Sequence, residues 1–220
     1  MKLKKNHKLV IAADGSAASG KTTGAKIISK KYGLQFLSSG LLYRYASYQL
    51  LKQKPKNTIF FLKKHFSNLN LKKLNNKNLH SSEVSAHTSI IAKEKKIRNI
   101  LKNFQKNFVK KYNKVCIEGR DIGTVILPKA DVKFFFKCNL DVAAKRRFKE
   151  LKKTNKHISF AAVKKAMRIR NNSDKKRKNS PLIQAENAVI VQTDKLKNIE
   201  GMIYKMSKTI EEKIKKKYGN

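Results

Sequence analysis

A phosphate-loop motif near the start of the chain constrains the fold more than any other feature. The residues Gly15-Ser16-Ala17-Ala18-Ser19-Gly20-Lys21-Thr22 match the pattern G-x-x-x-x-G-K-[ST] at every position. In this pattern the glycines let backbone N–H groups turn inward around phosphates, the lysine adds a positive charge, and the hydroxyl that follows binds Mg²⁺. An apolar run at 9–13 precedes the motif and a helical pattern at 22–32 follows it. This context predicts a strand, a phosphate-binding loop and a helix rather than a simple Gly/Ser-rich turn.

The length and hydropathy of the chain favour a globular α/β protein. With 220 residues, 40% of them hydrophobic, the chain is able to bury a core as one domain or as one domain with an inserted lobe. No apolar run reaches the ~18 residues that a membrane span needs, and the short apolar run near the N-terminus continues directly into the phosphate loop. We therefore expect a cytoplasmic protein with no membrane partner, in which Cys116 and Cys138 are buried, reduced thiols.

The net charge of +39 is typical of a protein that binds nucleic acid. However, the charge is spread along the chain and comes mostly from lysine, so we expect incidental binding to polyanions and no dedicated nucleic-acid partner. The few arginines are better candidates for site residues, because a guanidinium binds phosphate through two parallel hydrogen bonds. They are Arg44, Arg98, Arg120, Arg146, Arg147, Arg168, Arg170 and Arg177.

The remaining apolar and periodic segments predict an alternation of strands and helices. Strands are expected at 35–37, 115–117, 132–136 and 188–191, and helices at 45–52, 84–91, 97–111, 140–153, 160–170 and 196–218. Residues 53–80 break the alternation, with a helix at 58–66 and short strands within 69–79 as the expectation. We therefore predict a P-loop NTPase-type three-layer sandwich with about five parallel strands. Residues 1–52 and 98–220 form its core, and residues 53–97 form an inserted substrate lobe.

Charged residues follow the predicted strand at 115–117, in the sequence Glu118-Gly119-Arg120-Asp121. Burying unpaired charges is costly, and in doubly wound sheets ligands bind at the carboxyl ends of the strands. We therefore predict a ligand site there. A basic segment at 168–181 contains one acid, Asp174, and suits a short lid over phosphates, with a solvated charged loop as the alternative.

Several segments resemble bacterial cytidylate kinases and occur in that family's order and spacing. They are Asp14-Gly15-Ser16-Ala17-Ala18-Ser19-Gly20-Lys21, Ser39-Gly40-Leu41-Leu42-Tyr43-Arg44, Glu118-Gly119-Arg120-Asp121-Ile122-Gly123-Thr124 and Asp174…Arg177…Pro181-Leu182. The resemblance covers nearly the whole chain and implies phosphoryl transfer from ATP, with Mg²⁺, to CMP or dCMP by a monomeric enzyme with an NMP-binding lobe at 53–97. The chain departs from the family at Ser16, where proline is usual, at Thr22, where glycine is common, and at Ser38 and Glu118, which replace aspartates.

The resemblance also implies roles for individual residues. The ATP phosphates are bound by Gly15 to Thr23, with Lys21 at the β- and γ-oxygens and Thr22 at Mg²⁺. The CMP phosphate is bound by Ser39, Tyr43, Arg44 and Arg120. Cytosine faces Ser89, Arg98 and Asp121, and the ribose and base lie near Asp174 and Arg177. The catalytic residues are Lys21, Arg120, Arg146 and Arg170, with Arg147 as a further lid arginine.

Two alternatives remain open at this point. The first is a P-loop kinase for another nucleoside monophosphate or a small hydroxyl acceptor, which has the same fold. The second is a basic ATPase that depends on RNA or DNA, which the positive charge favours. The position of the arginines in the phosphate-transfer motifs, and not in a separate stripe, argues against the second alternative.

Overall fold

A computed structural model describes residues 3–4, 6–153, 157–196 and 198–219 of the chain. The chain divides into two compact units: Met1–Leu37 with Asn113–Asn220, here called the sheet unit, and Ser38–Tyr112, here called the helical unit. The helical unit extends beyond the predicted lobe at 53–97 on both sides. The reason is that helix α2 (Ser39–Gln53) packs on α4 (Ser82–Ile91), and α5 (Lys95–Lys111) packs on α3 (Thr58–Ser67).

The sheet has five strands in the order β2-β3-β1-β4-β5. The strands are β1 (Leu9–Gly15), β2 (Gln35–Ser38), β3 (Lys114–Gly119), β4 (Val132–Lys137) and β5 (Val189–Gln192). Strands β3 and β4 flank β1 in parallel, with Ala13 opposite both Glu118 and Phe134, and β5 is parallel to β4. Every residue of β1 is buried, which explains why the strand is apolar from Leu9 to Ala13. The predicted α/β fold and its parallel sheet are confirmed.

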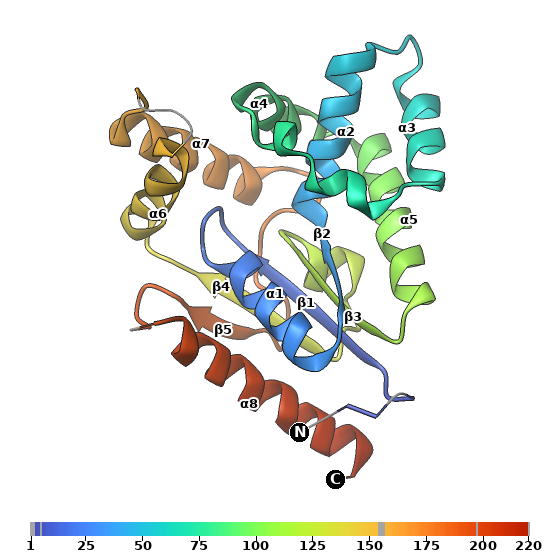
Figure 1. Ribbon diagram of the computed structural model, residues 1–220, viewed down its shortest axis with the longest axis vertical. Coiled ribbons are helices and arrows are strands. Elements are labelled where there is room, and N and C mark those ends of the chain that lie inside the picture. The colour runs from blue at the N-terminus through green and yellow to red at the C-terminus, as the bar shows by residue number, and fades with distance from the viewer. Residues whose placement is uncertain (1–2, 5, 154–156, 197, 220) are drawn as a thin grey trace. The chain divides into compact units, whose positions relative to one another are not determined.

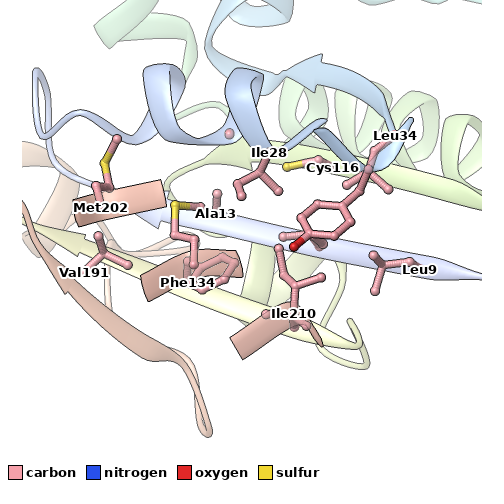
Figure 2. Packing of buried hydrophobic residues seen from close by; sticks show 14 of the residues in the cluster. Leu9, Ala13, Ile28, Leu34, Cys116, Phe134, Val191, Met202 and Ile210 are labelled. Atoms are coloured by element: carbon pink, nitrogen blue, oxygen red, sulfur yellow. The ribbon is translucent and has the colours of Figure 1, made fainter. Parts of the chain in front are cut away.

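Helices α1 (Lys21–Tyr32) and α8 (Ile199–Tyr218) lie against the sheet and form with it the hydrophobic core of the sheet unit (Figure 1). This unit also contains α6 (Leu140–Lys152), α7 (Phe160–Lys176) and a short π-helical turn, η3 (Ile122–Ile126). Figure 2 shows Ile28 of α1 and Ile210 of α8 against Ala13 and Phe134 of the central strands. Helices α6 and α7 pack on each other around a separate small cluster that includes Ala144 and Val163.

In the helical unit the predicted strands within 69–79 are wrong. Two 3₁₀ turns occupy this segment, η1 (Leu71–Asn75) and η2 (Lys77–His80). The side chains of Asn70 and Asn76 cap these turns by accepting hydrogen bonds from backbone N–H groups two residues later, so the local asparagines favour turns over extended chain.

Some helix boundaries also differ from prediction. Helix α2 begins at Ser39 instead of 45, because the Ser38 hydroxyl caps it by accepting a hydrogen bond from Leu41 N–H at 3.3 Å. Helix α7 continues to Lys176, so much of the predicted lid at 168–181 is helical. The helix predicted from 196 begins at Ile199, and Lys197 lies outside the described residues. No described helix is both long and apolar enough to cross a membrane.

Candidate active site

The phosphate loop links β1 to α1 with a backbone that requires glycine at its ends. A Cβ added to Gly15 would lie 2.6 Å from the carbonyl oxygen of Phe136, closer than real contacts allow. Gly20 has φ of 81°, in the left-handed region, and Ala18 has φ of 52°. Gly20 is the N-cap of α1, and no described side chain caps this helix start. The first N–H groups of α1 therefore remain available to an anion.

Lys21 lies buried at the start of α1 and faces the end of β3. Its Nζ is 3.4 Å from Glu118 Oε2 and 3.5 Å from the carbonyl oxygen of Ser16. Burial lowers the pKa of Lys21 to about 8, and the positive charge of Arg120 acts in the same direction while Glu118 opposes it. The lysine thus sits in an excess of positive charge, an environment that a bound phosphate would neutralise.

Arg120, at the end of β3, belongs to a network of charged side chains with Asp174 of α7 and Arg177. Arg120 Nε donates to Asp174 Oδ2 at 2.9 Å, and Arg177 approaches Asp174 Oδ1 at 3.5 Å and Asp121 Oδ1 at 4.0 Å. Burial alone would raise the pKa of Asp174, but the surrounding charges, Arg120 foremost, hold it below its usual value. These residues, all predicted to bind the acceptor, therefore lie together at the carboxyl end of the sheet.

The lid arginines separate into different environments. Arg170 lies close enough for its charge to act on the pKa of both Lys21 and Asp174. Arg147, in contrast, pairs with Glu150 at 2.7 Å, three residues further along α6. The structure thus brings Arg170, but not Arg147, into the field of the phosphate loop.

Arg146 is held by Thr193, which follows β5. Its guanidinium donates to the Thr193 hydroxyl at 3.1 Å and to the Thr193 carbonyl at 2.9 Å, and that hydroxyl donates to the carbonyl of Ser19 in the phosphate loop. Beside these residues is a cavity of about 270 Å³. It is lined by Gly20, Thr23, Arg146, Thr193, Leu196, Asn198, Ile199 and Met202.

The two cysteines differ from each other, which corrects the prediction that both are buried. Cys116 is fully buried, and burial raises the pKa of its thiol to about 12. Cys138 is only partly buried, and its Sγ lies 3.6 Å from Arg146. The difference arises because Cys116 lies within β3, whereas Cys138 follows the end of β4.

The other predicted acceptor residues belong to the helical unit. Arg44 of α2 donates to the carbonyl oxygen of Leu79 and to the Ser85 hydroxyl, both at 2.8 Å. Arg98 of α5 is buried, donates to the Ala92 carbonyl at 3.0 Å and lies 5.6 Å from the ring centroid of Tyr43. Ser39 is buried at the start of α2, and the Ser89 hydroxyl donates to the carbonyl of Ser85.

Three residues with direct contacts to predicted site residues or to their loops were missed by sequence analysis. They are Asp14, whose carboxylate contacts the backbone after Asp121, Ser85, which holds Arg44, and Thr193, which holds Arg146. Asp14 is the only one of the three inside a motif singled out from the sequence, and its partners are 108 and 109 residues away. Ser85 follows Ser81 and Ser82 at a helix start, a pattern that signals capping and nothing more.

Comparisons with known proteins agree with these features. The family model for cytidylate kinase matches residues 11–212. The cytidylate kinase of Rickettsia rickettsii (strain Sheila Smith) is 37% identical over 194 residues, which cover 86% of each chain. That of Thermosipho melanesiensis is 35% identical over 215 residues, covering 93% of this chain and 98% of the relative. The solved shikimate kinase from Bacteroides thetaiotaomicron shares the fold, with a TM-score of 0.51 at 15% identity and coverage of 92% and 98%.

Proposed function

The chain belongs to the cytidylate kinase family, and we propose that it transfers the γ-phosphoryl group of ATP to CMP or dCMP through the residues described above. The products are ADP and CDP or dCDP. The observation that supports these roles most strongly is the cluster at the carboxyl end of the sheet. There, buried Lys21 lies in the field of Arg120 and Arg170 with Glu118 as a close carboxylate. Such a cationic, desolvated cluster stabilises the negative charge of a phosphoryl group during its transfer.

The phosphate loop, Gly15 to Thr23, binds the phosphates of ATP in this proposal. The loop's backbone N–H groups and the start of α1 supply hydrogen bonds, and Lys21 supplies charge at the β- and γ-oxygens. We assign the cavity of about 270 Å³ beside Arg146 to the adenosine part, because it adjoins Gly20 and has apolar side chains with a guanidinium that is able to stack on a base. Arg146 thus contacts the bound ATP.

A magnesium ion fits the residues that are present. Thr22 lies in the first turn of α1, where a hydroxyl after the phosphate-loop lysine holds Mg²⁺. Among the described residues no group of three His, Cys, Asp or Glu side chains is able to hold a metal. Mg²⁺ commonly binds through few protein ligands together with substrate phosphates, so Thr22 and ATP suffice. The ion would supply charge neutralisation between the transferring phosphates.

CMP is bound in this proposal by the residues that the resemblance to cytidylate kinases implies. Ser39, Tyr43, Arg44 and Arg120 bind its phosphate, Ser89, Arg98 and Asp121 face the cytosine, and Asp174 with Arg177 lies near the ribose and base. The amino group of cytosine donates where uracil accepts, so a carboxylate acceptor such as Asp121 favours cytosine. A wrong base leaves buried groups unpaired at about 1–3 kcal/mol each.

No general base is needed for the transfer. The second pKa of a phosphate monoester is near ~6, so CMP is largely a dianionic nucleophile at neutral pH. The residues therefore act by bringing two repelling phosphates into line and by neutralising charge, the roles of Lys21, Arg120 and Arg170. A cytoplasmic, monomeric enzyme fits these soluble substrates.

The experiment that tests this function is an ADP-release assay over a panel of acceptors: CMP, dCMP, UMP, AMP, GMP and shikimate. We expect CMP and dCMP to give the highest kcat/KM. Faster turnover of UMP, AMP or shikimate would contradict the assigned acceptor. In a parallel arm without acceptor, RNA or DNA should leave the rate of ATP hydrolysis unchanged, since stimulation would indicate the nucleic-acid-dependent ATPase.

A further inference from the structure

Asp14 is a buried carboxylate with no role in the function proposed so far. It ends the apolar part of β1 and directly precedes Gly15, and it is 3% exposed. A carboxylate removed from water is stable only where its oxygens accept good hydrogen bonds. The partners of Asp14 therefore indicate what the residue does.

Both oxygens of Asp14 accept hydrogen bonds from the backbone of η3. Ile122 N–H donates to Oδ1 at 2.8 Å, and Gly123 N–H donates to Oδ2 at 2.7 Å. The first N–H groups of a helical turn have no acceptor within the turn, and Asp121, the residue before η3, makes no side-chain cap. Asp14, which belongs to β1, thus caps a turn that lies 108 residues later in the chain.

The contact requires a close approach of the turn to Asp14. A Cβ added to Gly123 would lie 3.3 Å from Asp14 Oδ2 and 3.1 Å from the Cβ of Ala185, both tighter than ordinary contacts. Glycine at this position lets the N–H group reach the carboxylate, so the turn is confined on both sides.

The turn begins directly after two proposed acceptor residues. The pairing of β1 with β3 sets Gly119 opposite Asp14, and Asp14 itself holds Ile122. Arg120 and Asp121 therefore lie on a backbone segment that is anchored at each end. An error of about 1 Å in the position of such groups is enough to slow a reaction by about 10²-fold.

We infer that Asp14 is a positioning residue, which holds Arg120 and Asp121 in their CMP-binding geometry by anchoring the turn η3. The inference rests on the proposed function, because Arg120 and Asp121 bind CMP only in that proposal. Asp14 touches neither substrate in this role, and its effect is confined to the acceptor side of the reaction.

The test compares Asp14→Asn with Asp131→Asn. Asp131 is a matched control, since its Oδ2 also accepts a backbone hydrogen bond, from Val10 N–H at 2.8 Å, but near the opposite end of β1. The asparagine at position 14 has the same size but presents an N–H group to one of the two backbone donors. We expect kcat/KM for CMP to fall by about tenfold or more, with the KM for ATP unchanged.

In Asp131→Asn, kcat/KM for CMP and KM for ATP should both remain at wild-type values, even if the thermal unfolding midpoint of this variant falls. Equal kinetics of the two variants in an active protein overturn the inference, as does an equal loss for CMP and ATP in Asp14→Asn. If Asp14→Asn does not fold, Gly123→Ala displaces the same contact from the other side. It should weaken CMP selectively, and wild-type kinetics for CMP would overturn the inference. A wild-type protein that does not phosphorylate CMP overturns the proposed function itself, and the inference with it.

Discussion

The two ends of the sheet differ in how their charged side chains are arranged. At the amino end, Asp131 accepts from Val10 N–H and pairs with Lys217 at 2.7 Å, and the Tyr218 hydroxyl contacts both Lys8 N–H and the Lys8 carbonyl at 2.8 Å. The His7 ring stacks on Tyr218 with centroids 4.0 Å apart. These contacts join the start of β1 to the end of α8, and each joins complementary groups.

At the carboxyl end, cationic side chains gather around buried Lys21, and carboxylates pair with two of them: Glu118 with Lys21 at 3.4 Å and Asp174 with Arg120 at 2.9 Å. Lys21 lies in the field of Arg120 and Arg170, and the hydroxyl oxygens of Ser19 and Thr124 are buried without a hydrogen-bond partner among the described residues. Unpaired buried polar groups cost free energy at both ends, since His7 Nδ1 at the amino end also lacks a hydrogen-bond partner among the described residues. The carboxyl end differs in the excess of positive charge around Lys21. The comparison indicates that the amino end stabilises the fold, while the carboxyl end is organised for a charged ligand.

The largest expected effect comes from removing the buried charge of the carboxyl end. In Lys21→Met the apolar side chain fills the same space, so the protein should remain folded by circular dichroism. The rate of ADP formation with CMP should fall by about 10³-fold, because phosphoryl charge loses its buried cation. A loss below tenfold would show that the comparison overstates the role of this end.

The pH dependence of stability should show the free-energy cost of burying the charged Asp14 carboxylate at the carboxyl end. Burial raises the pKa of Asp14 from 3.8 to about 6. Its contribution to stability is therefore fully present below about pH 4 and is lost as the pH rises through about 6, a span of about 3 kcal/mol. Urea unfolding of wild type and Asp14→Asn across this range should reveal the difference, since the asparagine does not titrate. Parallel stability curves for the two proteins would contradict it.

Arg120→Lys keeps the charge but removes the planar fork that binds Asp174. Lysine provides no pair of parallel donors, so we expect kcat with CMP to fall by about 10²-fold. Thermal unfolding should change little, because the residue lies at the end of β3 and is partly exposed. Turnover near the wild-type rate would remove Arg120 from the site.

The amino end should show the reverse behaviour. Tyr218→Phe keeps the ring that stacks on His7 and removes only the hydroxyl that contacts Lys8. The free energy of unfolding should fall by about 1 kcal/mol in urea titrations, with kcat and KM unchanged. A kinetic effect in this variant would break the division of roles between the two ends.

The smallest effect is expected within the phosphate loop. Ala18 has φ of 52°, where a Cβ is unfavourable. Glycine relieves this strain but increases the entropy of the unfolded chain, so Ala18→Gly should change stability by less than about 1 kcal/mol, in the stabilising direction. Chemical unfolding measures the difference, and a loss of about 1 kcal/mol would show that the strain is absent.

Local sequence patterns predicted the parts of the fold that depend on local burial. Strand β1 and helix α1 were predicted because an apolar run and an apolar helix face flank the motif. The prediction of strands within 69–79 was wrong because the spaced leucines of this segment suit a strand as well as a turn. The capping asparagines favour the turns. The predicted start of α2 was too late in the chain because Ser38, which caps the helix, lies outside the periodic apolar pattern.

Sequence reasoning named a candidate site residue only where a motif contains it. Lys21 and Arg120 lie in motifs, whereas the contacts of Asp14 with Gly123 and of Arg146 with Thr193 join residues far apart in the sequence. Such contacts depend on the order of strands in the sheet, since β3 and β4 both flank β1 only after folding. No periodicity or spacing in the chain encodes them.

The unequal cysteines give the protein a built-in attachment point for a reporter group. Cys116 is fully buried within β3 and, with a thiol pKa of about 12, resists alkylation. Cys138 is partly accessible and touches Arg146, which lines the cavity beside the phosphate loop. A fluorophore coupled through maleimide would therefore attach at one position of the unmodified chain. On the proposed assignment of this cavity to the adenosine part of ATP, its emission would follow nucleotide occupancy without any engineered residue.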